Sequence, residues 1–86
     1  MYTVYVLKSK KDGKNYYGFT RDLEKRLMEH NNGKVTATRN RTLFIVVYGE
    51  QVSDLLSAVK REKYFKSGFG RKYVKNKLKM ALSSIG

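Results

Sequence analysis

Tyrosine, arginine and histidine side chains gather in one short segment, NYYGFTRDLEKRLMEH, which runs from residue 15 to residue 30. A phenol can donate or accept a hydrogen bond, an imidazole can move a proton near neutral pH, and a guanidinium binds phosphate oxygens in a planar fork. Together these groups can hold and hydrolyse a phosphodiester. Tyrosine is also common in β-strands, so plain packing is the alternative interpretation of Tyr16 and Tyr17.

Helical spacing makes Arg26 and His30 neighbours, because they are four residues apart on a predicted helix. Leu23 and Leu27 define the inward face of this helix. His30 lies within that face and Arg26 lies at its edge. Taken singly, the arginine could make a salt bridge, and the histidine could be a packing or capping residue.

The tyrosines are placed by the hairpin that the Asp-Gly pair at 12–13 predicts. If the loop holds an even number of residues, the numbers of cross-strand partners sum to an odd number, roughly 23 or 25 and not an even value between them. Tyr16 then shares one face of the sheet with Tyr5, and Tyr17 points to the other face. A bulge in the hairpin would break this inference.

Glu62 is the most anomalous residue of the sequence. It falls near the centre of the apolar face of a predicted helix over 53–66. A carboxylate in that position is costly unless it is paired or binds a metal. It is therefore a candidate metal ligand, and a salt bridge to Arg26 is the structural alternative.

The composition restricts the class of protein. Eighty-six residues predict a single domain over 1–86, and 19 Lys and Arg against seven Asp and Glu give a net charge of +12. This charge predicts a nucleic-acid partner, although a ribosomal-type basic protein is also compatible with it. The absence of cysteine excludes disulfides and thiolate metal sites, and one histidine argues against a multi-histidine zinc centre. Without a membrane span or signal pattern, we expect a cytoplasmic protein with no membrane partner.

Hydrophobic patterns predict strands over 3–7, 15–19 and 43–48. The third run is apolar nearly throughout, which predicts a central strand covered on both faces. Helices are expected from residue 20 or 22 to about 31, over 53–66, and over 71–82, where Val74, Leu78, Ala81, Leu82 and Ile85 have helical spacing. Residues 34–41 are expected to be an exposed loop. The predicted fold class is α+β, a three-stranded, mainly antiparallel sheet flanked by helices in the order β-β-α-β-α-α.

Several of these motifs occur in the same order in a known family. Thr3-Val4-Tyr5 and Tyr16-Tyr17-Gly18, RLMEH, the glutamate of REKYFK, and the segments 31–41 and 65–71 together resemble the GIY-YIG nucleases. The likeness covers essentially the whole chain. It is closest to small stand-alone bacterial members and to the nuclease domain of the excision-repair nuclease C subunit. The first motif keeps only its tyrosine, and Tyr17 stands where the family has isoleucine.

The resemblance implies divalent-metal-dependent endonuclease activity on DNA. Glu62 would bind a single Mg²⁺ or Mn²⁺ whose other ligands are mostly water. Tyr5 would act as general base toward the attacking water or orient it, and Tyr16 would hold the nucleophile or the phosphate. Arg26 would stabilise charge on the phosphate. His30 would assist proton transfer or orient Tyr5, and the sequence leaves both roles open.

Further residues carry weaker implications. Gly18 would let the backbone approach the site closely, and Asn76 is a candidate for an asparagine that many family members have near the end of the domain. Phe69 could stack on an unpaired base or anchor a helix connection. The expected DNA-binding residues are basic and come from two segments: Lys34, Arg39, Arg41, Lys66, Arg71 and Lys72.

We expect weak sequence specificity, or a preference for branched or nicked DNA, in DNA repair or recombination, with a protein partner as one means of targeting. The alternative from another functional class is a non-catalytic or weakly active nucleic-acid-binding module of the same fold. A basic RNA-binding protein is a third interpretation. Binding that survives Glu62→Ala without metal-dependent cleavage would favour either alternative.

Overall fold

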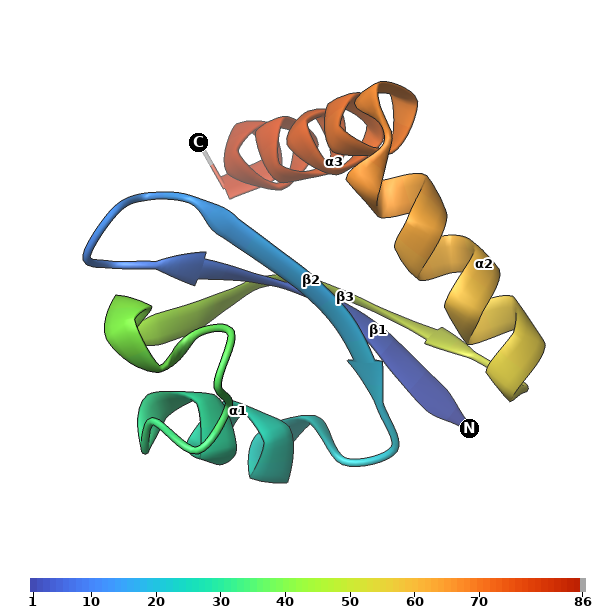
Figure 1. Ribbon diagram of the computed structural model, residues 1–86. Coiled ribbons are helices and arrows are strands. Elements are labelled where there is room, and N and C mark those ends of the chain that lie inside the picture. The colour runs from blue at the N-terminus through green and yellow to red at the C-terminus, as the bar shows by residue number, and fades with distance from the viewer. Residues whose placement is uncertain (86) are drawn as a thin grey trace.

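A computed structural model describes residues 1–85 and the side chains of residues 1–79. Its elements are the strands β1 (Tyr2–Ser9), β2 (Asn15–Thr20) and β3 (Phe44–Val52), the helices α1 (Leu23–Asn31), α2 (Leu55–Lys66) and α3 (Gly68–Ile85), and a short 3-10 helix, η1 (Arg39–Arg41). The fold is α+β in the predicted order. Helix α1 covers one face of the sheet, and α2 and α3 cover the other (Figure 1).

The sheet is antiparallel with strand order β2-β1-β3, so β1 is the central strand. The prediction that residues 43–48 form a central strand is therefore wrong. Leu43, Ile45 and Val46 are exposed, whereas Val4, Tyr5, Val6 and Leu7 of β1 are all buried. An apolar run alone does not distinguish a covered strand from an edge strand with exposed apolar side chains.

A β-bulge interrupts the pairing of β1 with β3. Val6 pairs with Tyr48 and Leu7 pairs with Val46, so Val47 has no partner in the register. As a result, Phe44 and Tyr48 lie on opposite faces of the sheet although both have even numbers. Phe44 packs on the α1 side, and Tyr48 packs against the core formed with α2 and α3.

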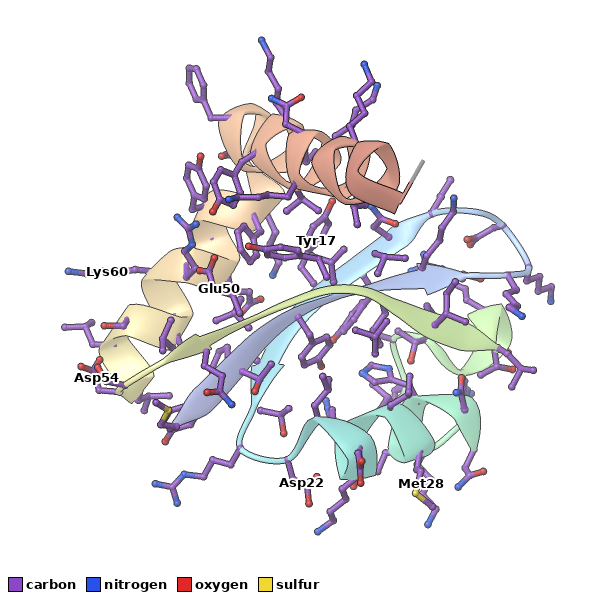
Figure 2. The ribbon with its side chains drawn as sticks, turned by 180° about the vertical axis from the view of Figure 1, so that it is seen from behind. Tyr17, Asp22, Met28, Glu50, Asp54 and Lys60 are labelled. Carbon is purple, nitrogen blue, oxygen red and sulfur yellow. The ribbon has the colours of Figure 1, made fainter. Side chains whose placement is uncertain are left out.

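Each face of the sheet has its own core. On one face, Tyr5, Leu7 and Phe44 pack with Leu23 and Leu27 of α1. On the other face, the buried residues are Val4, Val6, Ala58, Phe65 and Val74. Figure 2 shows Glu50 of β3 directed toward α2, where the Arg61 Nε donates to its carboxylate over 2.6 Å.

The connection between α2 and α3 is shorter than predicted, because α3 begins at Gly68 and not at Arg71. Ser67 ends α2, and its hydroxyl accepts a hydrogen bond from the Gly70 N–H. A Cβ at Gly70 would overlap the Tyr64 carbonyl and lie 2.6 Å from Phe65 Cα. Val74 is buried and Leu78 half-buried as predicted, while the side chains of Ala81, Leu82 and Ile85 lie outside the described residues.

Residues 34–41 are not simply an exposed loop. Residues 39–41 form η1, and Thr38 immediately before it is fully buried. The turn is closed by hydrogen bonds from Thr38 N–H to the Val35 carbonyl and from Arg41 N–H to the Thr38 carbonyl. Among the described residues, no helix is long and apolar enough to cross a membrane.

Candidate active site

The hairpin register brings Tyr5 and Tyr16 to the same face of the sheet. Leu7 pairs with Tyr16 and Tyr5 pairs with Gly18, so partner numbers sum to 23, as one of the two predicted registers requires. Tyr16 packs with the α1-side core, and Tyr17 packs with the opposite core. Figure 2 shows Tyr17 on the side of the sheet toward α3. The predicted separation of the two adjacent tyrosines is confirmed.

Helix α1 carries His30 into this face. The Asp22 carboxylate caps the helix by accepting a hydrogen bond from the Lys25 N–H over 3.1 Å, as predicted for one of two candidate caps. At the other end, the Asn31 side chain accepts from the Phe44 N–H and donates to the Phe44 carbonyl. These two bonds fix the end of α1 against β3, one residue after His30.

His30 is fully buried among four side chains. Its Nε2 lies 3.3 Å from the Tyr5 hydroxyl, and its Nδ1 lies 2.7 Å from the Thr38 hydroxyl. The rings of Tyr16 and Phe44 have centroids 4.9 and 5.7 Å from that of the imidazole. Sequence reasoning missed Thr38, because neither periodicity nor a motif marks one buried threonine in a polar segment.

The surroundings of Tyr5 and His30 favour the uncharged form of both side chains. Burial raises the pKa of the Tyr5 hydroxyl, and the Arg26 guanidinium beside it offsets part of that increase. Burial, together with the positive charge of Arg26, lowers the pKa of His30 below 6.5. At pH 7, Tyr5 is therefore a neutral phenol and His30 a neutral imidazole, next to a permanent cation.

Arg26 lies at the rim of the cluster with about a third of its side chain exposed. The Tyr5 hydroxyl beside it is the main cause of a raised Arg26 pKa. Its carboxylate partner is Glu29 at 3.4 Å, and not Glu62 as the structural alternative supposed. The guanidinium lines an open groove of about 350 Å³ with Phe19, Thr20, Arg21, Asp22, Lys25 and Glu29.

Gly18 leaves room for the Tyr5 hydroxyl. A Cβ at this position would overlap the phenol oxygen and lie 2.6 Å from Tyr5 Cζ. The cross-strand partner of Tyr5 on its other side is also a glycine, Gly49, but a Cβ there would meet nothing closer than Thr3 Cγ2 at 3.6 Å. The close approach that was expected at Gly18 is therefore made to the side chain of Tyr5.

Glu62 lies on α2, and α2 contributes to the core on the face away from α1. Its side chain is 18% exposed and forms an ion pair with Lys66 at 2.5 Å. Its negative charge is the smallest of the effects that raise the pKa of Tyr5. The described residues contain no cluster of three or more His, Cys, Asp or Glu that could hold a metal, so any ion bound at Glu62 would keep mostly water ligands.

The predicted nucleic-acid-binding residues differ in their surroundings. Lys34, Arg39, Arg71 and Lys72 are exposed, whereas Arg41 donates to the Asp12 carboxylate over 2.8 Å and Lys66 is paired with Glu62. Asn76 is exposed on α3, and no described hydrogen bond joins it to the Tyr5 and His30 cluster. Phe69 is 82% exposed, so it does not anchor the helix connection.

Comparison with known proteins identifies one matching family model and several similar proteins. The model of the GIY-YIG catalytic domain matches residues 1–78. UPF0213 protein SSP2268 of Staphylococcus saprophyticus is 37% identical over 73 residues, which cover 84% of this chain and 88% of that protein. UPF0213 protein SH2523 of Staphylococcus haemolyticus is 38% identical over 78 residues, or 90% and 89% of the two chains. A UPF0213 protein of Bacillus pumilus is 44% identical over 64 residues, 73% of this chain and 64% of its own length. No solved structure matches.

Proposed function

Because the chain belongs to the GIY-YIG family, whose catalytic domain is a nuclease domain, we propose that it is a divalent-metal-dependent endonuclease that hydrolyses DNA phosphodiester bonds. The observation that carries this proposal is the Tyr5 hydroxyl, held 3.3 Å from His30 Nε2 and beside the Arg26 guanidinium. A buried phenol with an imidazole and a cation as neighbours is suited to proton transfer at a phosphate. The net charge of +12 supports a polyanionic substrate.

In this proposal, the residues of the cluster have separate tasks. Arg26 lies on the groove and binds the scissile phosphate, whose developing charge a guanidinium stabilises. Tyr5 orients the attacking water, or it takes the proton of that water as a phenolate that has first lost its own proton to solvent and is stabilised by Arg26. The Tyr16 hydroxyl donates a hydrogen bond to the nucleophile or to a phosphate oxygen. His30 is bonded to Tyr5 and sets the position of the phenol.

Glu62 is the proposed ligand of a Mg²⁺ or Mn²⁺ ion. Its carboxylate is partly exposed and is paired with the Lys66 ammonium. The Lys66 side chain is 53% exposed, so it can rotate away from the carboxylate. One carboxylate with water ligands suits a hard cation that keeps its hydration. When bound, such an ion supplies Lewis-acid polarisation of a phosphate oxygen and lowers the pKa of a bound water.

Cleavage of supercoiled plasmid and of a branched DNA, with Mg²⁺, Mn²⁺ or EDTA, tests the proposal. We expect metal-dependent nicking that is lost in Glu62→Gln and Tyr5→Phe. Matched controls are Glu24→Gln, which changes an exposed carboxylate of α1, and Tyr17→Phe, which changes the tyrosine on the opposite face. Both should cleave like wild type. Equal residual cleavage in all variants would indicate a contaminant and contradict the proposal.

A non-catalytic nucleic-acid-binding module is the second candidate, and the Lys66–Glu62 ion pair favours it, because a paired carboxylate needs no metal. This candidate predicts salt-sensitive DNA binding that is unchanged by Glu62→Gln and by EDTA, without cleavage. Lys66→Gln separates the two, since freeing Glu62 should strengthen metal-dependent cleavage in a nuclease. It should only weaken binding slightly in a binding module.

We also propose weak sequence specificity. The exposed basic side chains Lys34, Arg39, Arg71 and Lys72 are suited to phosphate contacts, which position a protein on DNA without reading its sequence. A cleavage map on a long duplex should therefore show scattered sites, with more frequent cuts at nicks or branches. A single long recognition sequence would contradict this expectation.

A further inference from the structure

The hydrogen bonds of His30 form a chain of three buried residues. Thr38, His30 and Tyr5 are 0%, 0% and 1% exposed. The imidazole links the other two, with Nδ1 2.7 Å from Thr38 Oγ1 and Nε2 3.3 Å from Tyr5 Oη. A neutral imidazole has one N–H donor and one acceptor nitrogen, so the chain must have a direction.

One end of the chain decides this direction. Among the described residues, Nδ1 of His30 is the only hydrogen-bond partner of the Thr38 hydroxyl. If Nδ1 carried the proton, the Thr38 oxygen would accept a hydrogen bond from Nδ1–H, and the O–H of Thr38 would be buried without an acceptor. A buried donor left in that state costs about 1–3 kcal/mol. If Nδ1 is the acceptor, the Thr38 O–H is satisfied.

The Tyr5 end has different surroundings. Tyr5 is itself buried and does not line the groove, but its hydroxyl is beside Arg26, whose partly exposed side chain does. A water or phosphate oxygen held by Arg26 can therefore accept a hydrogen bond from the phenol. Nε2–H of His30 then donates to the phenol oxygen over 3.3 Å, and the Arg26 guanidinium lies beside that oxygen. The direction from Thr38 through His30 to Tyr5 leaves the remaining O–H at the end beside Arg26 and the groove, whereas the reverse direction leaves it at Thr38, where no described residue can accept it.

We infer that Thr38 is a positioning residue, whose hydroxyl holds His30 in the tautomer that donates from Nε2 to the Tyr5 oxygen. In this tautomer His30 cannot take the proton of Tyr5, because Nε2 already carries one. It stabilises negative charge on the phenol oxygen instead. The consequence for catalysis rests on the proposed nuclease function, but the assignment of the tautomer does not.

The tautomer can be measured directly, because His30 is the only histidine in the 86-residue sequence. Long-range ¹H–¹⁵N correlation spectra of the protein, freed of any histidine tag, distinguish protonated from unprotonated ring nitrogens. At pH 7.5, wild type and Thr38→Ser should show one tautomer, with Nε2 protonated and Nδ1 not. Thr38→Val keeps the shape without the hydroxyl, and it should lose this single tautomer.

A protonated Nδ1 in wild type, or an unchanged spectrum in Thr38→Val, would overturn the inference. Thr36→Val, in the same segment but exposed, is the matched control and should leave the spectrum unchanged. If Thr38→Val does not fold, as judged by circular dichroism, the wild-type and Thr38→Ser spectra still decide.

Cleavage kinetics test the role of the tautomer separately. Thr38→Val should lower kcat about ten- to a hundredfold with DNA binding unchanged, and Thr38→Ser should restore it. An unchanged kcat in a variant that has lost the tautomer would refute the positioning role. Absence of cleavage in wild type would refute the proposed function and leave the spectral result standing.

Discussion

Gly18 and Gly49 offer a matched pair of substitutions, because both are cross-strand partners of Tyr5, one on each side. Neither has a positive φ, so alanine is compatible with both backbones. Replacing a strand glycine with alanine stabilises a protein by about 0.5–1 kcal/mol when the methyl group fits. The two sites therefore differ mainly in what the new Cβ meets.

At Gly18 the methyl group would overlap the phenol. Its Cβ would overlap the Tyr5 hydroxyl and lie 2.6 Å from Tyr5 Cζ, so the ring must withdraw by at least about 0.8 Å to reach ordinary contact at 3.4 Å. Tyr5 is 1% exposed, and overpacking of this kind costs about 1–3 kcal/mol. We expect Gly18→Ala to lower the free energy of unfolding by about 0.5–2 kcal/mol and Gly49→Ala to raise it slightly.

The activity of the same two variants should differ more than their stability. A displacement near 1 Å of a group at the reaction centre can cost about a hundredfold in rate. We expect such a loss in Gly18→Ala under conditions where it is fully folded, and no loss in Gly49→Ala. Urea unfolding and plasmid cleavage measure the two effects. The destabilisation should also be smaller when Tyr5→Phe is already present.

Equal behaviour of the two alanine variants would refute this reasoning. It would mean that the Tyr5 ring moves aside without cost, and that the hydroxyl position is not set by Gly18. A destabilised Gly18→Ala with full activity would refute only the second step, the requirement for this position of the phenol.

Three further predictions concern the elements that support the site. Gly70→Ala should destabilise the protein by about 3 kcal/mol or more, because its Cβ would meet backbone atoms of α2; Gly68→Ala, with nothing within 4 Å, should be neutral or stabilising in the same urea titration. Asn31→Ala should lower the free energy of unfolding by about 1–3 kcal/mol, because it leaves the Phe44 backbone groups without partners. The neighbouring Asn32→Ala should lower it much less. Equal losses in the two variants would show that the hydrogen bonds from Asn31 to Phe44 do not stabilise the fold. Finally, the free energy of unfolding should fall as the pH drops below about 6.5, since unfolded His30 binds a proton there and folded His30, whose pKa is lowered, does not. The slope is at most about 1.4 kcal/mol per pH unit, and a flat profile between pH 5 and 7 would contradict a buried neutral imidazole.

The parts of the site that follow from local geometry could be predicted from the sequence. The separation of Tyr16 from Tyr17 depends only on strand alternation and on the hairpin register. The inward position of His30 depends only on the period of α1 and on the apolar face marked by Leu23 and Leu27. These relations extend over short stretches of chain, where backbone geometry leaves few choices.

The rest depends on contacts between distant segments. Thr38 reaches His30 because residues 35–41 form a turn, and no period in the sequence encodes this turn. The sequence does not show which of the three strands pairs with both of the others. In the structure that strand is β1, so β3 lies at an edge of the sheet. Glu62 and Lys66 are four residues apart on one helix, so their ion pair follows from helical spacing. That Glu62 pairs with Lys66 and not with Arg26 depends on the face of the sheet on which α2 packs.

The bulge at Val47 has a consequence for how the chain tolerates changes in length. Phe44 belongs to the core around His30, and Tyr48 belongs to the core around Phe65, so the interval between them connects two independent packing environments. Removing one residue from this interval would restore regular pairing and force one of these aromatic rings onto the wrong face. In a scan of single deletions, positions 45–47 should therefore be intolerant, although Ile45 and Val46 are exposed on an edge strand. Side-chain exposure would then be a poor guide to indel tolerance along β3.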